Sequence, residues 1–149
     1  GFGSPEETLA YAKERIEEVI KNYGGDRAHM VLTGFSRGSI ACGFIGLRDE
    51  AIASYWKGIH GCQHCDGSKW RQSDMKDAIE RAKRFRGEAI YQTDNDPEKY
   101  APVAWATAPA VEWTWDYSGL GFHATAMFLD DRPSTLRLRE WYRELVSDP

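Results

Sequence analysis

The sequence has few cysteines, no excess of basic residues and no long apolar run. Its 149 residues include three cysteines, too few for a small disulfide scaffold. Acidic residues outnumber basic ones by 23 to 19, and the formal net charge is −4. No apolar stretch approaches the roughly 20 residues that cross a bilayer. A membrane span and a disulfide framework are therefore excluded, and neither nucleic acid nor a membrane is an expected partner.

The composition is that of one folded domain. Hydrophobic residues make up 42% of the chain and charged residues 28%, a balance typical of globular proteins. A length near 150 residues is the usual size of a single domain, so we expect one domain over residues 1–149. The chain begins with glycine rather than methionine and has no signal segment. We therefore expect a processed or truncated piece of a longer protein.

Apolar periodicity predicts an alternation of helices and strands. Spacings of three and four residues predict helices over residues 4–23, 37–47, 73–85 and 134–146. Short apolar or alternating runs predict strands over residues 28–33, 54–61, 88–93 and 111–117. The run 28–33 is continuously apolar, as in a strand covered on both faces, whereas 111–117 alternates, as in a half-covered strand near a sheet edge. The pattern predicts an α/β fold with a mostly parallel sheet and helices on both faces.

The clearest chemical motif is GFSRG, residues 34–38, which fits the pattern G-x-S-x-G. It lies directly between a predicted buried strand and a predicted helix. A serine on such a sharp turn is held above the sheet, and small residues two places before and after it avoid collisions. Ser36 is therefore the candidate nucleophile. The amide of Arg37, at the start of the helix, is the candidate donor to a developing oxyanion.

A serine hydroxyl needs a base, and the base needs an orienting acid. On this scaffold the expected chain order is serine, acid, histidine. His123, in a glycine-containing loop after the last predicted strand, is the candidate base. Asp96, after the third predicted strand, is the favoured acid, with Asp94 and Asp66 as alternatives.

Three segments resemble the α/β-hydrolase-fold serine esterases. Residues 26–38 resemble the strand and turn that carry the nucleophile, 89–97 resemble the acid-bearing strand and loop, and 121–123 resemble the histidine loop. The resemblance implies hydrolysis of a carboxylic ester, of a small molecule or a polymer, through an acyl-serine intermediate and without a cofactor or metal. Within the family the layout is closest to secreted esterases and depolymerase-like hydrolases, which favours a secreted protein.

The resemblance begins at the helix before the nucleophile strand. The family's earlier strands, and the loop that supplies a second oxyanion amide, have no counterpart in this sequence. A central strand left at an open edge is normally covered. We therefore expect the chain to be the C-terminal half of a hydrolase, whose preceding half is a separate chain or lies outside this sequence.

Residues 60–65, HGCQHC, place four candidate metal ligands close together. A tetrahedral zinc site needs a second ligand pair, and the chain offers no second knuckle. A loop that shapes the substrate pocket is therefore favoured over a metal site at Cys62, His64 and Cys65, or a redox pair of the two cysteines. A metal-binding domain remains an alternative function, and a catalytically silent binding or assembly module is another.

Two further features have structural and functional interpretations. The aromatic residues of the second half are expected to pack in the core rather than form a ligand platform: Trp105, Trp113, Trp115, Tyr117 and Trp141. The guanidinium of Arg37, beside the nucleophile, either steers an acidic substrate or is a solvated charge.

Overall fold

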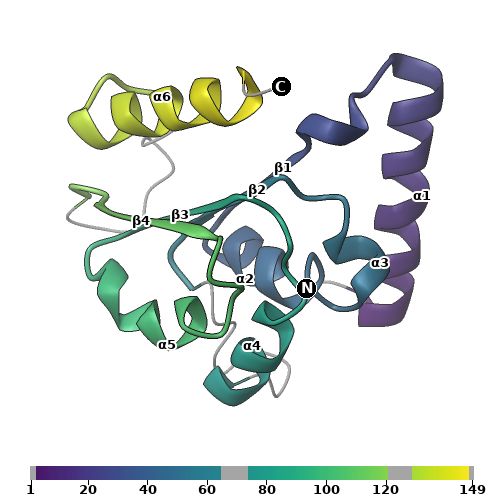
Figure 1. The fold of residues 1–149 in the computed structure, drawn as a ribbon, viewed down its shortest axis with the longest axis horizontal. Helices are drawn as coiled ribbons and strands as arrows, with labels where there is room; N and C mark the ends of the chain where they lie inside the picture. The colour runs from purple at the N-terminus through teal and green to yellow at the C-terminus, as the bar shows by residue number, and fades with distance from the viewer. Residues whose placement is uncertain (1–2, 65–73, 121–128, 148–149) are drawn as a thin grey trace.

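The computed structural model describes residues 3–64, 74–120 and 129–147 (Figure 1). Its centre is a sheet of four parallel strands in the order β1-β2-β3-β4. The strands are β1 (Val31–Phe35), β2 (Gly58–Cys62), β3 (Ala89–Asp94) and β4 (Glu112–Tyr117). The predicted α/β fold with a parallel sheet is confirmed at this level.

The helices lie on both faces of the sheet. They are α1 (Pro5–Tyr23), α2 (Arg37–Phe44), α3 (Glu50–Ala53), α4 (Met75–Ala82), α5 (Ala101–Ala104) and α6 (Pro133–Ser147), with 3-10 turns η1 (Arg27–His29) and η2 (Pro97–Tyr100). Figure 1 shows α6 on one face and α2, α4 and α5 on the other. Every helix within the described part of the chain is too short or too polar to cross a membrane.

Side-chain caps explain two differences between predicted and observed strand starts. The first strand begins at Val31 rather than at residue 28, because the carboxylate of Asp26 accepts a hydrogen bond from the Ala28 amide and starts η1. The second begins at Gly58 rather than at residue 54, because the unpredicted helix α3, capped by Asp49, is followed by turns in which the amides of residues 54–56 donate to carbonyls of α3. Caps and turn hydrogen bonds thus take residues that apolar content alone assigns to strands.

The sheet separates two apolar clusters. One lies between the sheet and helices α2 and α3: Cys42, Leu47, Ile52, Ala53, Trp56, Ile59, Phe85 and Ile90. The other lies between the sheet and α6: Cys62, Ala89, Tyr91, Leu120, Leu138, Trp141 and Leu145. The two central strands, β2 and β3, are buried along their whole length, as parallel strands with helices on both faces should be.

The first strand differs from this pattern. Among the described strands β1 is an edge, and only Gly34 of its five residues is buried, while Thr33 is exposed. Both faces of β1 nevertheless contact the core, Leu32 on the side of α2 and α3 and Val31 and Phe35 on the side of α6, so the predicted cover is present but partial at this edge. The opposite edge, β4, is half covered as predicted.

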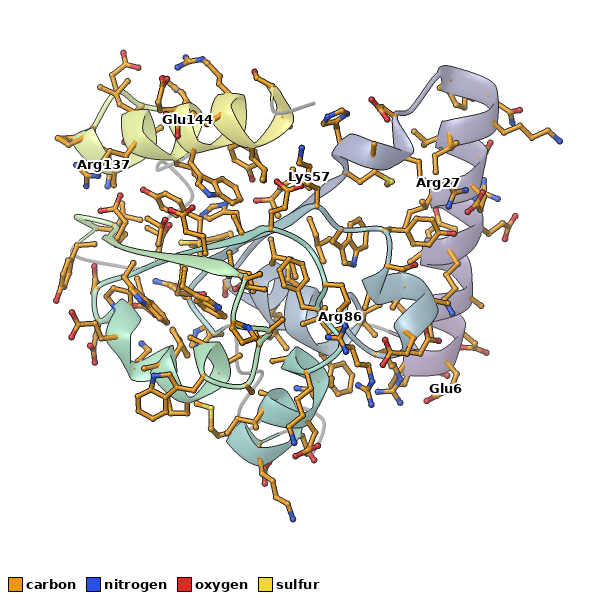
Figure 2. All side chains as sticks on the ribbon, viewed as in Figure 1. Glu6, Arg27, Lys57, Arg86, Arg137 and Glu144 are labelled. Carbon is orange, nitrogen blue, oxygen red and sulfur yellow. The ribbon has the colours of Figure 1, made fainter. Side chains whose placement is uncertain are left out.

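Helix α1 stands beside this open edge. None of its 19 residues, all of them described, is buried. It is attached by apolar contacts of Leu9, Ala12 and Ile16 with the core and by ion pairs. Among the ion pairs, Glu17 binds Arg27 and Glu6 binds Arg48; Figure 2 labels Glu6 at one end of the helix and Arg27 farther along it. A cavity of about 370 Å³ remains between the apolar side of α1, β1 and α2.

Candidate active site

Ser36 occupies the sharp turn between β1 and α2. Its backbone has φ 54° and ψ −115°, in the left-handed half of conformational space that residues other than glycine rarely adopt. Its amide donates a hydrogen bond of 2.9 Å to the carbonyl of Cys62, which fixes the turn against the end of β2. The hydroxyl does not cap α2. A strained serine with a hydroxyl free of the helix terminus is the geometry expected of a nucleophile on such a turn.

The two glycines of the motif differ in how much space a side chain would have at each position. A Cβ atom at Gly34 would lie 2.3 Å from the backbone carbon and oxygen of Gly38, so no side chain fits there. A Cβ atom at Gly38 would meet nothing within 4 Å. The sequence-based explanation, that both positions must be small to avoid collisions, is therefore correct for Gly34 and wrong for the side chain at Gly38.

Arg37 is the first residue of α2. Its amide is therefore one of the helix N-terminal donors without an intrahelical partner, which suits it to an oxyanion. Its side chain is exposed. The guanidinium next to Ser36 in the sequence is thus accessible from solvent.

The two candidate acids of the β3 loop are in different environments. Asp94, the last residue of β3, is buried, and its carboxylate accepts from the Tyr100 hydroxyl at 3.1 Å and pairs with Lys99 at 2.8 Å. Asp96 is exposed and does not cap η2. Within the described residues its carboxylate has no hydrogen bond or ion pair. Asp96 is therefore available to orient an imidazole, whereas Asp94 is committed to holding the loop.

Tyr100 connects the loops that follow β2 and β3. Its buried hydroxyl accepts a hydrogen bond of 2.7 Å from the backbone amide of His64 and donates to Asp94. The sequence predicted no role for this residue. A tyrosine three places after Asp-Pro carries no local signal of a contact with residue 64, 36 positions away.

His123 and Asp66 lie outside the described residues. The described chain before the histidine loop is tied to the acid loop. Ser118 donates its amide to the Asp94 carbonyl at 2.9 Å and its hydroxyl to the Asn95 side chain at 2.8 Å. The same hydroxyl accepts from the amide of Leu120 at 3.3 Å. Ser118, five positions before His123 in the sequence, is thereby anchored beside Asp94 and Asn95.

Of the histidine and cysteine cluster, His60 and Cys62 are buried in the core, whereas His64 is exposed. His60 is fully buried, and its Nδ1 and Nε2 atoms lie 2.9 and 3.1 Å from the hydroxyls of Thr33 and Thr93. Burial raises the pKa of the Cys62 thiol to about 12, which opposes thiolate chemistry. Cys65 lies outside the described residues. Within residues 3–64, 74–120 and 129–147, no three His, Cys, Asp or Glu side chains gather to hold a metal ion.

The aromatic residues divide between core and surface. Trp141 is buried under α6, and Trp113 packs against the core and stacks on Trp115 with ring centres 4.9 Å apart. Trp105 and Tyr117 are exposed, 81% and 59%. The expectation of core packing is therefore wrong for these two residues. Trp105 follows the four-residue helix α5, and Tyr117 is the last residue of β4.

Comparison with models of protein families gives no match, and a search of curated proteins gives none. The chemistry of the site must therefore be argued from its geometry.

Proposed function

We propose that this protein is a serine hydrolase of the α/β-hydrolase type that cleaves a carboxylic ester through an acyl intermediate on Ser36. The observation that carries the proposal is the backbone of this serine, with φ 54° at a strand-to-helix turn. Such strain costs about 1–3 kcal/mol and persists where the surroundings enforce it, most often at functional sites. Here the close approach of Gly34 to Gly38 and the hydrogen bond to Cys62 enforce it.

In the proposed reaction the Ser36 oxygen attacks the ester carbonyl while His123 accepts the serine proton. The histidine then gives this proton to the departing alcohol, leaving an acyl-serine. Water, deprotonated by the same imidazole, attacks the acyl group, and the proton returns to Ser36 as the acid is released. Asp96 orients the imidazole and stabilises its charged form, a role supported by the free carboxylate of Asp96 and the engaged carboxylate of Asp94.

The negative charge that develops on the carbonyl oxygen is stabilised by the Arg37 amide at the start of α2. One such donor contributes about 3 kcal/mol to catalysis. No cofactor takes part in this proposal.

The test is covalent labelling with a fluorophosphonate probe. We expect labelling of the wild-type protein at Ser36, loss of labelling in Ser36→Ala, and unchanged labelling in Ser54→Ala, a control at an exposed serine. Labelling that survives Ser36→Ala would show that another residue is the nucleophile. Absence of any labelling would favour a catalytically silent binding module.

The two acids are separated by a matched pair of amide variants. Asp96→Asn should lower the rate of ester hydrolysis by about 10³-fold or more, as expected for loss of the group that orients a catalytic histidine. Asp94→Asn should act mainly on stability. A larger loss of rate in a folded Asp94→Asn protein would reverse the assignment.

The open edge of β1 supports a partner. We propose that a polypeptide equivalent to the preceding half of a hydrolase, present as a separate chain or joined to this one, pairs with β1 and supplies a second oxyanion amide. This proposal is supported by the outer side of β1, which pairs with no strand among the described residues, by its exposed Thr33, and by the neighbouring helix α1, none of whose residues is buried. Full activity in a native protein of 16.9 kDa, established by intact mass and size-exclusion chromatography, would refute it.

A further inference from the structure

The residue next to the nucleophile across the sheet is Gln63. Phe35 pairs with Cys62, and the Ser36 amide donates to the Cys62 carbonyl. Gln63 is therefore the first residue beyond β2, as Ser36 is the first beyond β1. Because neighbouring strands lie about 4.8 Å apart, the two backbones are adjacent at the edge where the reaction is proposed.

Gln63 is held in an unusual backbone conformation. Both it and His64 have positive φ, 64° and 47°. Hydrogen bonds enforce this corner, because the Gln63 amide donates to the Thr93 carbonyl at 2.9 Å and the His64 amide donates to Tyr100. The backbone at residues 63 and 64 is therefore held in one conformation. A residue that recognises a ligand needs such a rigid position.

The side chain of Gln63 carries an unsatisfied hydrogen-bond acceptor. The residue is 9% exposed, and its Oε1 atom is buried without a hydrogen-bond partner among the residues that the structure describes. A buried carbonyl oxygen is normally paired, and each exception calls for an explanation. An amide oxygen accepts from an O–H or N–H group, so what is missing is a donor.

We propose that Gln63 is a specificity-determining residue whose Oε1 accepts a hydrogen bond from a donor group, such as a hydroxyl, close to the scissile ester. The substrate class is therefore a carboxylic ester with a hydroxyl near the reacting carbonyl, on the acyl or on the alcohol side. This inference rests on the proposed function of Ser36. A site built to bind a hydroxyl discriminates strongly against the analogue that lacks it, because the buried acceptor is then left unpaired.

The test compares esters with and without a hydroxyl. In the first pair, 4-nitrophenyl 3-hydroxybutanoate is compared with 4-nitrophenyl butanoate, so the hydroxyl is on the acyl side. In the second pair, glyceryl butanoate is compared with propyl butanoate, so the added hydroxyls are on the alcohol side. We expect kcat/KM for the hydroxylated ester to be about 10-fold higher or more in at least one pair. Gln63→Met keeps the length of the side chain and removes the acceptor, so it should abolish this preference while hydrolysis of the plain ester continues.

Gln92→Met is the matched control. Gln92 also has a buried, unpaired Oε1, but it lies within β3 rather than at the edge beside Ser36. This variant should keep the preference of the wild type, which separates recognition from general stability. Equal rates for both members of each pair in the wild type would overturn the inference, and so would a preference that survives Gln63→Met. In either case, hydrolysis of the esters would still support the proposed function. Failure of Ser36 to react with the fluorophosphonate would instead reject both.

Discussion

At the level of single residues, the motif around Ser36, the proposed nucleophile, is asymmetric. The backbone carbon and oxygen of Gly38 leave no room for a side chain at Gly34, whereas position 38 is open. Gly34→Ala should therefore destabilise the protein by about 2–3 kcal/mol, the effect of forcing a methyl group into packed backbone, and should abolish labelling of Ser36. Urea unfolding and the fluorophosphonate probe measure the two effects.

Gly38→Ala is the control for this variant. Because its methyl group would enter open space and alanine favours helices, we expect stability to change by no more than about 1 kcal/mol. Equal damage from both substitutions would show that the turn does not depend on the contact described.

His60 predicts a dependence of stability on pH. Burial lowers the pKa of His60 from 6.5 to about 3, so the folded protein keeps the imidazole neutral while the unfolded chain takes up a proton below pH 6.5. The contribution of His60 is therefore fully present above pH 6.5. It should decline by up to about 1.4 kcal/mol per pH unit as the pH falls toward 3.

Urea unfolding between pH 7.5 and 4 tests this, with His60→Gln as the comparison. Glutamine can bond to Thr33 and Thr93 but does not titrate, so the variant should be less stable at pH 7.5 and less sensitive to acid than the wild type. Parallel curves for the two proteins would contradict the assignment, because carboxylates lower the stability of both in acid.

The part of the candidate site that lies within one local motif was predictable from sequence. The sequence 34–38 specifies a strand, a tight turn and a helix in consecutive residues, and the structure has all three. The roles of Gln63 and Tyr100 were not predictable, because they depend on strand register and on a contact 36 positions apart. The favoured choice of Asp96 over Asp94 gains support from the burial of Asp94 and its contacts with Lys99 and Tyr100, and these contacts are set by the folded structure rather than by a local motif.

Among the elements, α6 is joined to the sheet by a polar contact as well as an apolar one. Arg137 extends from α6 toward β4 (Figure 2) and binds both carboxylate oxygens of Asp116, at 2.9 and 2.5 Å. The Tyr91 hydroxyl of β3 donates to the same carboxylate. Three elements thus meet at one buried acid.

Arg137→Met should destabilise the protein by about 1–3 kcal/mol, because it leaves a nearly buried carboxylate without its cation. Arg143→Met removes the same charge from the same helix at an exposed pair with Glu140, and it should change stability by at most about 0.5 kcal/mol. Urea denaturation of both variants is the measurement. Similar values for the two would show that the contact with Asp116 contributes no more than a surface ion pair.

Long helices could be predicted from the sequence, whereas four-residue helices could not. The long helices α1 and α6 have apolar residues at helical spacing and were placed within one residue at each end. The four-residue helices α3 and α5 are too short to show that spacing and were missed. Their existence depends on capping and on the path between strands.

Across the complete chain, stability should be uneven. Helix α1 buries no residue, whereas every residue of β2 and β3 is buried. Local opening is easiest where few apolar contacts are broken. We expect the amides in the middle of α1 to exchange with deuterium at least about 10-fold faster than those of β2 and β3. Equal protection would show that α1 unfolds only with the sheet.

The hydrogen bonds between strands continue one residue past the strand ends, from Ser36 to Cys62, from Gln63 to Thr93 and from Ser118 to Asp94. The backbone beneath the reacting groups is therefore an extension of the sheet rather than a set of independent loops. Heating should consequently abolish the proposed labelling of Ser36 by the fluorophosphonate and the β circular-dichroism signal at one temperature. Brief warming below that temperature should leave the labelling intact after cooling.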